Sequence, residues 1–395
     1  MTDQSLSARL DRLLSEPLEA IRQRQQDTLL NVLGDFEQPF VLFGAGHLGK
    51  KVASVLLEMG LKPKAFIDNN PALWGRSVLG IEVLSPAHLA EREAGHLPAI
   101  ITTIWCGEAS DRMIDRLAPL HALGFERIAL FGHLAWRFPE KFLPHYSLDL
   151  PEKVIGEGAR IRQAFNLLSD DESKALFVDH VEWRLFLNYD LLPPASPLEI
   201  YFNDRFVNAN DEEVVYDIGA FNGDSIHGYI QSGRKYREIH SFEPSPNNYA
   251  DLKDTIAQLS GEYTGLHAHA MAVGDCVGEI LIETGNGPAS RVGMGTESVR
   301  MSSLDELGKE IRPATFIKID IEGFEPQCLA GGRQLISEAN PVLAVCVYHE
   351  QAHLWSILLQ LHEYYDGYSF SLCPHLAEGW DLVLYAVPAD RVAHH

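Results

Sequence analysis

The sequence predicts an α/β protein with two doubly wound, mostly parallel sheets joined by a helical segment. Apolar runs of strand length alternate with helix-like segments over residues 35–140, and the alternation returns over residues 206–395. Strands that alternate with helices form parallel βαβ units. Residues 141–205 between them follow a helical period and contain the proline-rich stretch LLPPASP, which prevents further helix.

Charge and cysteine usage narrow the classes of function. The chain of 395 residues carries 32 basic and 55 acidic residues, a formal net charge of −23, so nucleic acid and anionic membrane surfaces are poor partners. No apolar stretch reaches bilayer length, and the first residues do not have the order of a secretory signal. The five cysteines are scattered without a C-x-x-C pair, so a cytoplasmic protein without disulfides is expected.

The elements of the first half follow from periodicity. Residues 1–34 predict two N-terminal helices, because leucine and isoleucine recur at helical spacing and Pro17 interrupts the run. Helices are also expected near residues 52–59 and 110–123. The strands of this first, Rossmann-like domain are expected at residues 39–46, 64–70, 99–105 and 127–134.

The second half repeats this pattern with more strands. They are expected at residues 214–219, 239–244, 266–274, 279–283, 315–323, 341–349, 368–373 and 381–387. No clear helix separates the last two, so we expect them to form an antiparallel hairpin on an otherwise parallel sheet.

A glycine-rich turn, GAGHLG at residues 44–49, follows the first predicted strand and opens a helix. Gly44, Gly46 and Gly49 would let the backbone approach a diphosphate at the helix N-terminus. Asp68, at the end of the next strand, would bind ribose hydroxyls. Glycine also closes tight turns without any ligand, so a nucleotide site and a packing role both stay open.

The segment FGAGHLGKKVASVLLEMGLKPKAFIDNNPALWGRSVLGIEVLSP resembles the small Rossmann-type domain found beside sugar-modifying enzymes. The resemblance covers about one hundred residues. It implies a nucleotide or nucleotide-sugar ligand for the first domain, and it implies no reaction.

A second glycine turn, DIGAFNGD at residues 217–224, has an acid before its glycines. Asp217 with Gly219 and Gly223 suits a ligand that has an ammonium group and no phosphate, such as S-adenosylmethionine. Glu243 in SFEP stands at the tip of the next strand, where a carboxylate can accept both hydroxyls of a ribose. Asp217 could instead be a capping or turn carboxylate.

From about residue 200 to 390 the sequence resembles the FkbM family of S-adenosylmethionine-dependent methyltransferases. The matching pieces are VVYDIGAFNGDS, FEPSPNNY, AVGD, SSLDEL and IKIDIEGFE. The resemblance implies a class I methyltransferase fold with an antiparallel strand, and methyl transfer to a hydroxyl of a sugar, glycan or natural product. It further implies that Asp217, Gly219 and Gly223 form the methionine-side loop, that Glu243 holds the ribose and that Asp275 lies near the adenine.

An alcohol must lose its proton during methyl transfer, which calls for a general base or a metal ion. In KIDIEG, Lys318, Asp320 and Glu322 are expected on one face of a strand, with both acids at its carboxyl edge. These carboxylates could supply the base or share a divalent cation. Alternatively, Lys318 pairs with Asp320, and Glu322 and Glu325 cap the following helix.

Histidines offer further candidates. His349 ends the next predicted strand, so it should reach the same edge as a base, as a metal ligand or as a residue bonded only to backbone. His375 is a more distant candidate. His349, Glu350 and His353 spell the zinc-protease pattern H-E-x-x-H, but only His353 would lie on a helix, and a third ligand such as Glu378 has no motif.

The leading hypothesis is therefore an S-adenosylmethionine-dependent O-methyltransferase whose first domain positions a nucleotide-linked or sugar-containing acceptor. A non-enzymatic nucleotide-binding protein is the alternative, and a zinc metallopeptidase is a remote one. The acceptor pocket is expected from residues 285–300, as a lid or an inert surface loop, and from the helical segment 150–200.

Overall fold

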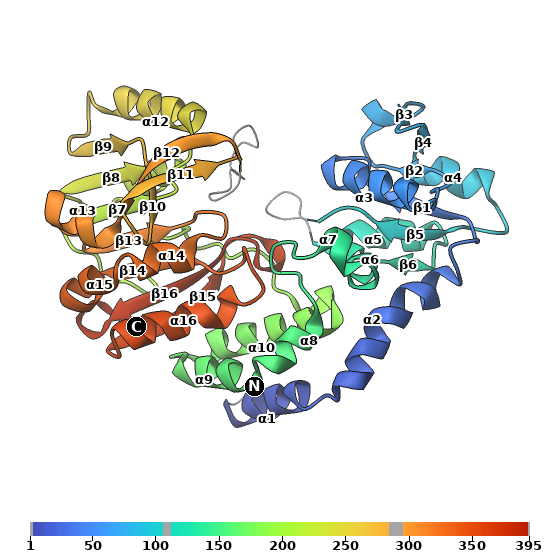
Figure 1. Ribbon diagram of the computed structural model, residues 1–395, viewed down its shortest axis with the longest axis horizontal. Coiled ribbons are helices and arrows are strands. Elements are labelled where there is room, and N and C mark those ends of the chain that lie inside the picture. The colour runs from blue at the N-terminus through green and yellow to red at the C-terminus, as the bar shows by residue number, and fades with distance from the viewer. Residues whose placement is uncertain (1–2, 106–111, 284–294, 394–395) are drawn as a thin grey trace.

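The computed structural model describes residues 3–105, 112–283 and 295–393. Figure 1 shows two α/β lobes side by side, with helices along one side that run from one lobe to the other. The predicted fold class is confirmed: each lobe holds a mostly parallel sheet with helices around it. No helix of the described ranges is long and apolar enough to cross a membrane.

The N-terminal helices do not form a unit of their own. Helices α1 (Asp3–Leu14) and α2 (Leu18–Leu33) are separated at Pro17, as predicted. The leucines of α1 are buried in the core of the second lobe, and Arg9 forms ion pairs of 2.7 Å with Asp179 and Glu182. Leu29 and Leu33 of α2 belong to the core of the first lobe. The two cores therefore divide this segment between them.

The first sheet has the strand order β3-β4-β2-β1-β5-β6, and all neighbours are parallel except β3 with β4. Its strands are β1 (Phe40–Phe43), β2 (Phe66–Ile67), β3 (Ser77–Val78), β4 (Ile81–Leu84), β5 (Ala99–Thr102) and β6 (Ile128–Ala129). The helices of this lobe are α3 (His47–Glu58), α4 (Pro86–Arg92), α5 (Met113–Ala122), α6 (Phe131–Arg137) and α7 (Pro139–Phe142). The sequence prediction missed the β3–β4 hairpin, and it took β6 and the start of α6 for one strand.

The linker is helical, as predicted, and contributes to both cores. It contains α8 (Pro151–Gly156), α9 (Gly158–Leu167), α10 (Asp171–Phe186) and a short 3-10 turn (Tyr189–Leu191). Phe177 and Val181 of α10 are buried with the second lobe, whereas Trp183 and Leu187 are buried with the first. Because one helix supplies side chains to both cores, it fixes the two lobes to each other.

The second sheet has seven strands in the order β15-β16-β14-β13-β7-β8-β9. They are β7 (Val214–Ile218), β8 (Glu238–Phe242), β9 (Leu266–His269), β13 (Phe316–Ile319), β14 (Val342–Cys346), β15 (Tyr368–Pro374) and β16 (Leu382–Pro388). Only β16 runs antiparallel to its neighbours, which confirms the predicted terminal hairpin. The helices are α11 (Asp224–Gln231), α12 (Pro246–Leu259), α13 (Leu304–Glu310), α14 (Glu325–Ala330), α15 (Arg333–Ala339) and α16 (His353–Tyr364).

A second, three-stranded sheet has the order β10-β12-β11 and was not predicted. Its strands are β10 (Ala272–Gly274), β11 (Gly278–Ile282) and β12 (Glu297–Ser303). The apolar run 266–274 is therefore two strands in two sheets. Of the proposed acceptor lid at 285–300, residues 285–294 lie outside the described residues, and the end of the segment belongs to β12.

Candidate active site

A cavity of about 440 Å³ opens at the carboxyl edge of the second sheet. It lies where the strand order reverses, between β7 with β8 on one side and β13 with β14 on the other. Open α/β sheets place their ligands at such a switch point. The rim is therefore open, and its walls come from the loops that follow these four strands, from the linker and from the β15–β16 turn.

The glycine loop after β7 forms one wall of this cavity. Gly219 has a φ of +82°, and a Cβ there would lie 1.9 Å from the carbonyl oxygen of Asp320. Gly223 has a φ of +91° and starts α11, where a Cβ would lie 2.8 Å from Thr255 Cγ2. Both positions therefore require glycine, because the loop lies against the loop after β13 and against α12.

Asp217 supports this glycine loop indirectly, through an ion pair with Lys318. Asp217 and Lys318 are register partners on the parallel strands β7 and β13, and Lys318 Nζ lies 3.1 Å from Asp217 Oδ1. The Lys318 ammonium also donates to the carbonyl oxygen of Gly219. Burial raises the pKa of Asp217, against the effect of Lys318. Lys318 therefore pairs with Asp217 and not with Asp320. This ion pair supports the glycine loop, and Asp217 itself does not line the cavity.

Glu243 directly follows β8, and its side chain lines the cavity. The N–H of Phe221 donates to its Oε2 at 3.0 Å, and the N–H of Ser245 donates to its Oε1 at 2.8 Å. Burial raises the pKa of Glu243, and these backbone hydrogen bonds act against that rise. An ionised carboxylate has about four acceptor positions. Asn248 Nδ2 also donates to Oε1, at 3.5 Å, so the open acceptor position is on Oε2, where a ribose hydroxyl can bind.

Asp320 and Glu322 both line the cavity, although not in the predicted way. Strand β13 ends at Ile319, and Glu322 has a φ of +57°, so the alternation of faces does not continue to these acids. Tyr201 Oη donates to Asp320 Oδ2 at 2.9 Å. His349 Nε2 lies 3.4 Å from Asp320 Oδ1 and 3.7 Å from Glu322 Oε1.

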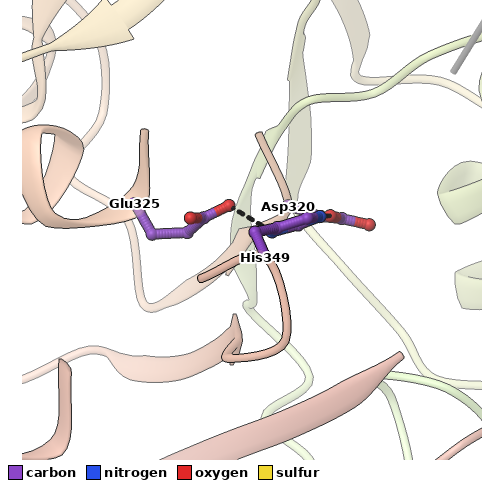
Figure 2. Close-up of side chains that lie close together, drawn as sticks. All are labelled: Asp320, Glu325 and His349. Atoms are coloured by element: carbon purple, nitrogen blue, oxygen red, sulfur yellow. Dashed lines mark ion pairs between the residues drawn. The ribbon is translucent and has the colours of Figure 1, made fainter. Parts of the chain in front are cut away.

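His349 lies between two carboxylates, as Figure 2 shows. It follows β14 by three residues, and its Nδ1 lies 2.9 Å from Oε1 of the fully buried Glu325. The same oxygen accepts the N–H groups of Ile321 and Gly323 at 3.0 and 3.3 Å. Burial favours the neutral imidazole, but Glu325, Asp320 and Glu322 outweigh it and raise the pKa of His349 to about 9. His349 is therefore a cation at neutral pH.

Glu325 is the functional candidate that sequence reasoning treated only as a helix cap. Burial would raise its pKa, but His349 and His353 outweigh burial and hold the pKa well below its usual range. The sequence did offer a sign of this role. In IDIEGFE, Glu325 is a third acid close to Asp320 and Glu322, and it starts a helix.

The ligand atoms of Asp320, Glu325 and His349 all lie within 4.8 Å of one another, a spacing at which three side chains can hold a metal ion. In Figure 2, however, Glu325 faces Nδ1 of the imidazole and Asp320 faces Nε2. One ion binds one nitrogen of a neutral imidazole. The arrangement therefore fits a protonated imidazole between two carboxylates better than it fits a shared metal ion.

The H-E-x-x-H pattern does not form a zinc-protease helix. Only His353 lies on α16, while His349 lies in the preceding loop. The Nδ1 atoms of both histidines are directed at Glu325, at 2.9 and 3.3 Å, and the side chain of Glu350 is 60% exposed. Glu378, the suggested third ligand, accepts the N–H of Met113 instead.

Two further candidates lie apart from the cavity lining. Asp275 is exposed in the turn between β10 and β11. His375 Nε2 lies 2.9 Å from Tyr385 Oη, and burial lowers the pKa of His375 to about 4. His375 is therefore neutral at physiological pH and hydrogen-bonded within the β15–β16 hairpin.

Aromatic residues from distant segments line the other end of the cavity, and sequence reasoning did not name them. Tyr146 comes from the linker, Tyr348 from the loop after β14 and Trp380 from the β15–β16 turn. The ring centroid of Trp380 lies 5.1 Å from that of Tyr146 and 5.6 Å from that of Tyr348. Asp381 lines the same end, and burial together with the charge of Asp320 raises its pKa to about 6.

The glycine turn of the first lobe is held by its own residues. A Cβ at Gly49 would lie 2.0 Å from the carbonyl oxygen of Gly44, so Gly49 packs directly on that turn, and Gly46 is the N-cap of α3. Asp68 Oδ2 accepts the N–H of Ala45 at 2.7 Å, and Asp68 Oδ1 accepts the N–H of Asn70 at 2.8 Å. These contacts show that the glycines and Asp68 pack the turn, and a nucleotide site there stays a prediction.

The strand order of the second sheet and the cavity at its switch point define the class I methyltransferase fold. Residues 217–370 match the family model described as Methyltransferase FkbM domain. The chain is therefore a methyltransferase. The non-enzymatic and metallopeptidase alternatives are accordingly wrong.

A solved structure agrees with this fold over nearly the whole chain. The methyltransferase FkbM from Methylobacillus flagellatus KT superposes with a TM-score of 0.76 at 19% identity, over 97% of this chain and 98% of that chain. Precorrin-6y C5,15-methyltransferase from Geobacter metallireducens GS-15 gives a TM-score of 0.28 at 12% identity, over 46% and 84%. The SAH-bound Podospora anserina methyltransferase PaMTH1 gives 0.27 at 14%, over 45% and 72%. The last two scores are too low to support an argument. No curated protein matches the chain.

Proposed function

We propose that this chain is an S-adenosylmethionine-dependent O-methyltransferase, with the cofactor in the cavity of the second lobe. One observation carries the proposal: Glu243 and Asp320 line the same cavity at the switch point. Its volume of about 440 Å³ lies in the range of small-molecule sites. In this proposal Glu243 binds the ribose diol, and the loop with Gly219 receives the methionine part.

Asp320 is the proposed base. Methyl transfer is an in-line displacement, so the acceptor oxygen must lie about 3 Å from the methyl carbon. The oxygen–carbon bond forms, the sulfur–carbon bond breaks, and the hydroxyl proton passes to Asp320. His349 cannot accept this proton at neutral pH, because it is already protonated. Its role is electrostatic: the imidazolium holds the carboxylates of Asp320 and Glu322 in place.

The proposed acceptor is a hydroxyl of a sugar, glycan or natural product, part of which is positioned by the first lobe. Trp105, three residues beyond β5, packs edge-to-face on Trp380 with ring centroids 5.9 Å apart. The carboxyl edge of the first sheet is thus next to the aromatic end of the cavity. A nucleotide at the turn of Gly44 and Gly46 would be on that same edge. Cys328 and Cys346 are buried free thiols, which supports action in the cytoplasm.

Calorimetric titration of the full chain with S-adenosylmethionine tests the cofactor. We expect one site, and we expect Glu243→Ala to weaken it by 30-fold or more, because a hydrogen bond from a ribose hydroxyl to a buried carboxylate contributes about 2–3 kcal/mol. Glu262→Ala, at an exposed position after α12, is the matched control and should bind as the wild type does. Folded wild-type protein without affinity for the cofactor would contradict the proposal.

A further inference from the structure

We propose that the acceptor carries a protonated amine beside the hydroxyl that is methylated. This inference rests on the proposed function and names the chemical class of the acceptor. It follows from the charges and the rings that line the end of the cavity farther from Glu243, where Tyr201, Tyr348 and Trp380 surround Asp320 and Asp381.

The cavity has a surplus of carboxylates. Its lining residues include one cationic side chain, Lys318, and five acids, which are Asp224, Glu243, Asp320, Glu322 and Asp381. The Lys318 ammonium is already paired with Asp217 at 3.1 Å. No charge of Lys318 therefore remains to receive an anionic group of a ligand.

The cofactor compensates only part of this surplus at the acceptor end, because its sulfonium, which carries the methyl group, offsets one of the charges there. S-adenosylmethionine brings a sulfonium, an ammonium and a carboxylate, so its net charge is +1. In the proposed pose its ribose lies on Glu243, and its methionine part lies by the glycine loop, near Asp224. Asp320, Glu322 and Asp381 are then left around the acceptor.

His349 is a cation of the protein near this end, and several carboxylates share its positive charge. Its Nδ1 lies 2.9 Å from Glu325, and its Nε2 lies 3.4 Å from Asp320. One imidazolium thus faces two carboxylates directly and Glu322 at 3.7 Å. The raised pKa of Asp381, to about 6, reflects burial first and then the charge of Asp320. Within the described residues, the acceptor end consequently stays negative after Lys318 and His349 are counted.

The aromatic rings at this end give a second, independent reason. Tyr146, Tyr348 and Trp380 are neighbours in edge-to-face contact, and they come from three separate segments. A cation near aromatic rings is stabilised by their quadrupoles. Rings together with carboxylates form a site that suits an ammonium group and offers nothing to an anion.

The alternatives fit less well. A phosphate or carboxylate on the acceptor would be buried among acids, with no unpaired cation in the described part of the cavity lining, which is strongly unfavourable. A neutral acceptor would exclude water and leave the acids uncompensated. A protonated amine offsets them, and it has no lone pair for the methyl group. The methyl group therefore goes to the hydroxyl, whose proton passes to Asp320. For a nucleotide-linked acceptor, the diphosphate must stay outside this cavity.

Three matched sugars test the inference on the full chain loaded with S-adenosylhomocysteine. The probes are methyl glucosaminide, its N-acetyl form and methyl glucuronide, measured by calorimetry. We expect the amine form to bind at least tenfold tighter than the N-acetyl form, and the anionic form not to bind. Asp381→Asn should reduce the preference for the amine at least threefold, whereas Asp366→Asn, at an exposed position, should not change it.

The outcomes separate this inference from the proposed function. Absence of S-adenosylhomocysteine binding would contradict the proposed function itself. Normal cofactor binding with equal affinity for the amine and N-acetyl forms, or with no sugar bound, would overturn the amine inference alone. Binding of Mg²⁺ that is lost in Asp381→Asn, without a preference for the amine, would also overturn it, because a metal ion would then supply the missing positive charge.

Discussion

Replacing Glu325 with glutamine removes one buried negative charge and little else. The amide oxygen can still accept the N–H groups of Ile321 and Gly323, while His349 loses its nearest carboxylate. The pKa of His349 is about 9 in the folded protein against an ordinary 6.5, a difference worth about 3 kcal/mol. Burial lowers the pKa of His349, and the interaction with Glu325 makes the largest contribution that raises it. We expect Glu325→Gln to lower it by two units or more.

The sign of the stability change follows from linkage. A raised histidine pKa contributes stability that is fully present below pH 6.5 and is lost as the pH rises through 9. Glu325→Gln should therefore lower the free energy of unfolding by about 3 kcal/mol at pH 6, and the difference should shrink above pH 9. Urea unfolding at the two pH values measures it.

Nitrogen-15 NMR of the imidazole ring measures the pKa of His349 directly between pH 5 and 10. Glu350→Gln is the matched control, because this exposed acid lies next to His353 and carries the same substitution. It should leave the titration of His349 unchanged. A wild-type pKa below 7, or a Glu325→Gln pKa within half a unit of the wild type, would refute the reasoning.

Three further substitutions test the site. Asp320→Asn should lower the rate of methyl transfer by 10²- to 10⁴-fold and leave the dissociation constant of S-adenosylmethionine within about threefold; a smaller rate loss would show that another group is the base. Tyr201→Phe removes the donor to Asp320 and should lower the free energy of unfolding by about 1–2 kcal/mol in urea, with unchanged stability as the contrary result. Gly219→Ala places a Cβ 1.9 Å from the carbonyl oxygen of Asp320 at a positive φ, so the melting temperature should fall by 5 °C or more; an unchanged value would mean that the loop can relax.

Much of the second lobe could be predicted from the sequence, because its strands are long apolar runs with clear ends. The carboxyl ends of parallel strands meet at one edge, so the positions of Gly219, Glu243 and Asp320 in the chain were sufficient to bring them to one cavity. The missed strands are short: β3 has two residues, and β10 has three. Periodicity has little to detect over such lengths.

The sequence by itself determined the class of fold, the edge at which the cavity opens and the acids placed there, since these follow from local periodicity and from strand direction. Only the tertiary structure decided how the charges are paired. Lys318 forms its ion pair with Asp217 because the register of β7 and β13 places the two residues side by side. His349 is an imidazolium because folding buries it among acids from a different segment, and a charge state depends on distances that no spacing along the chain encodes.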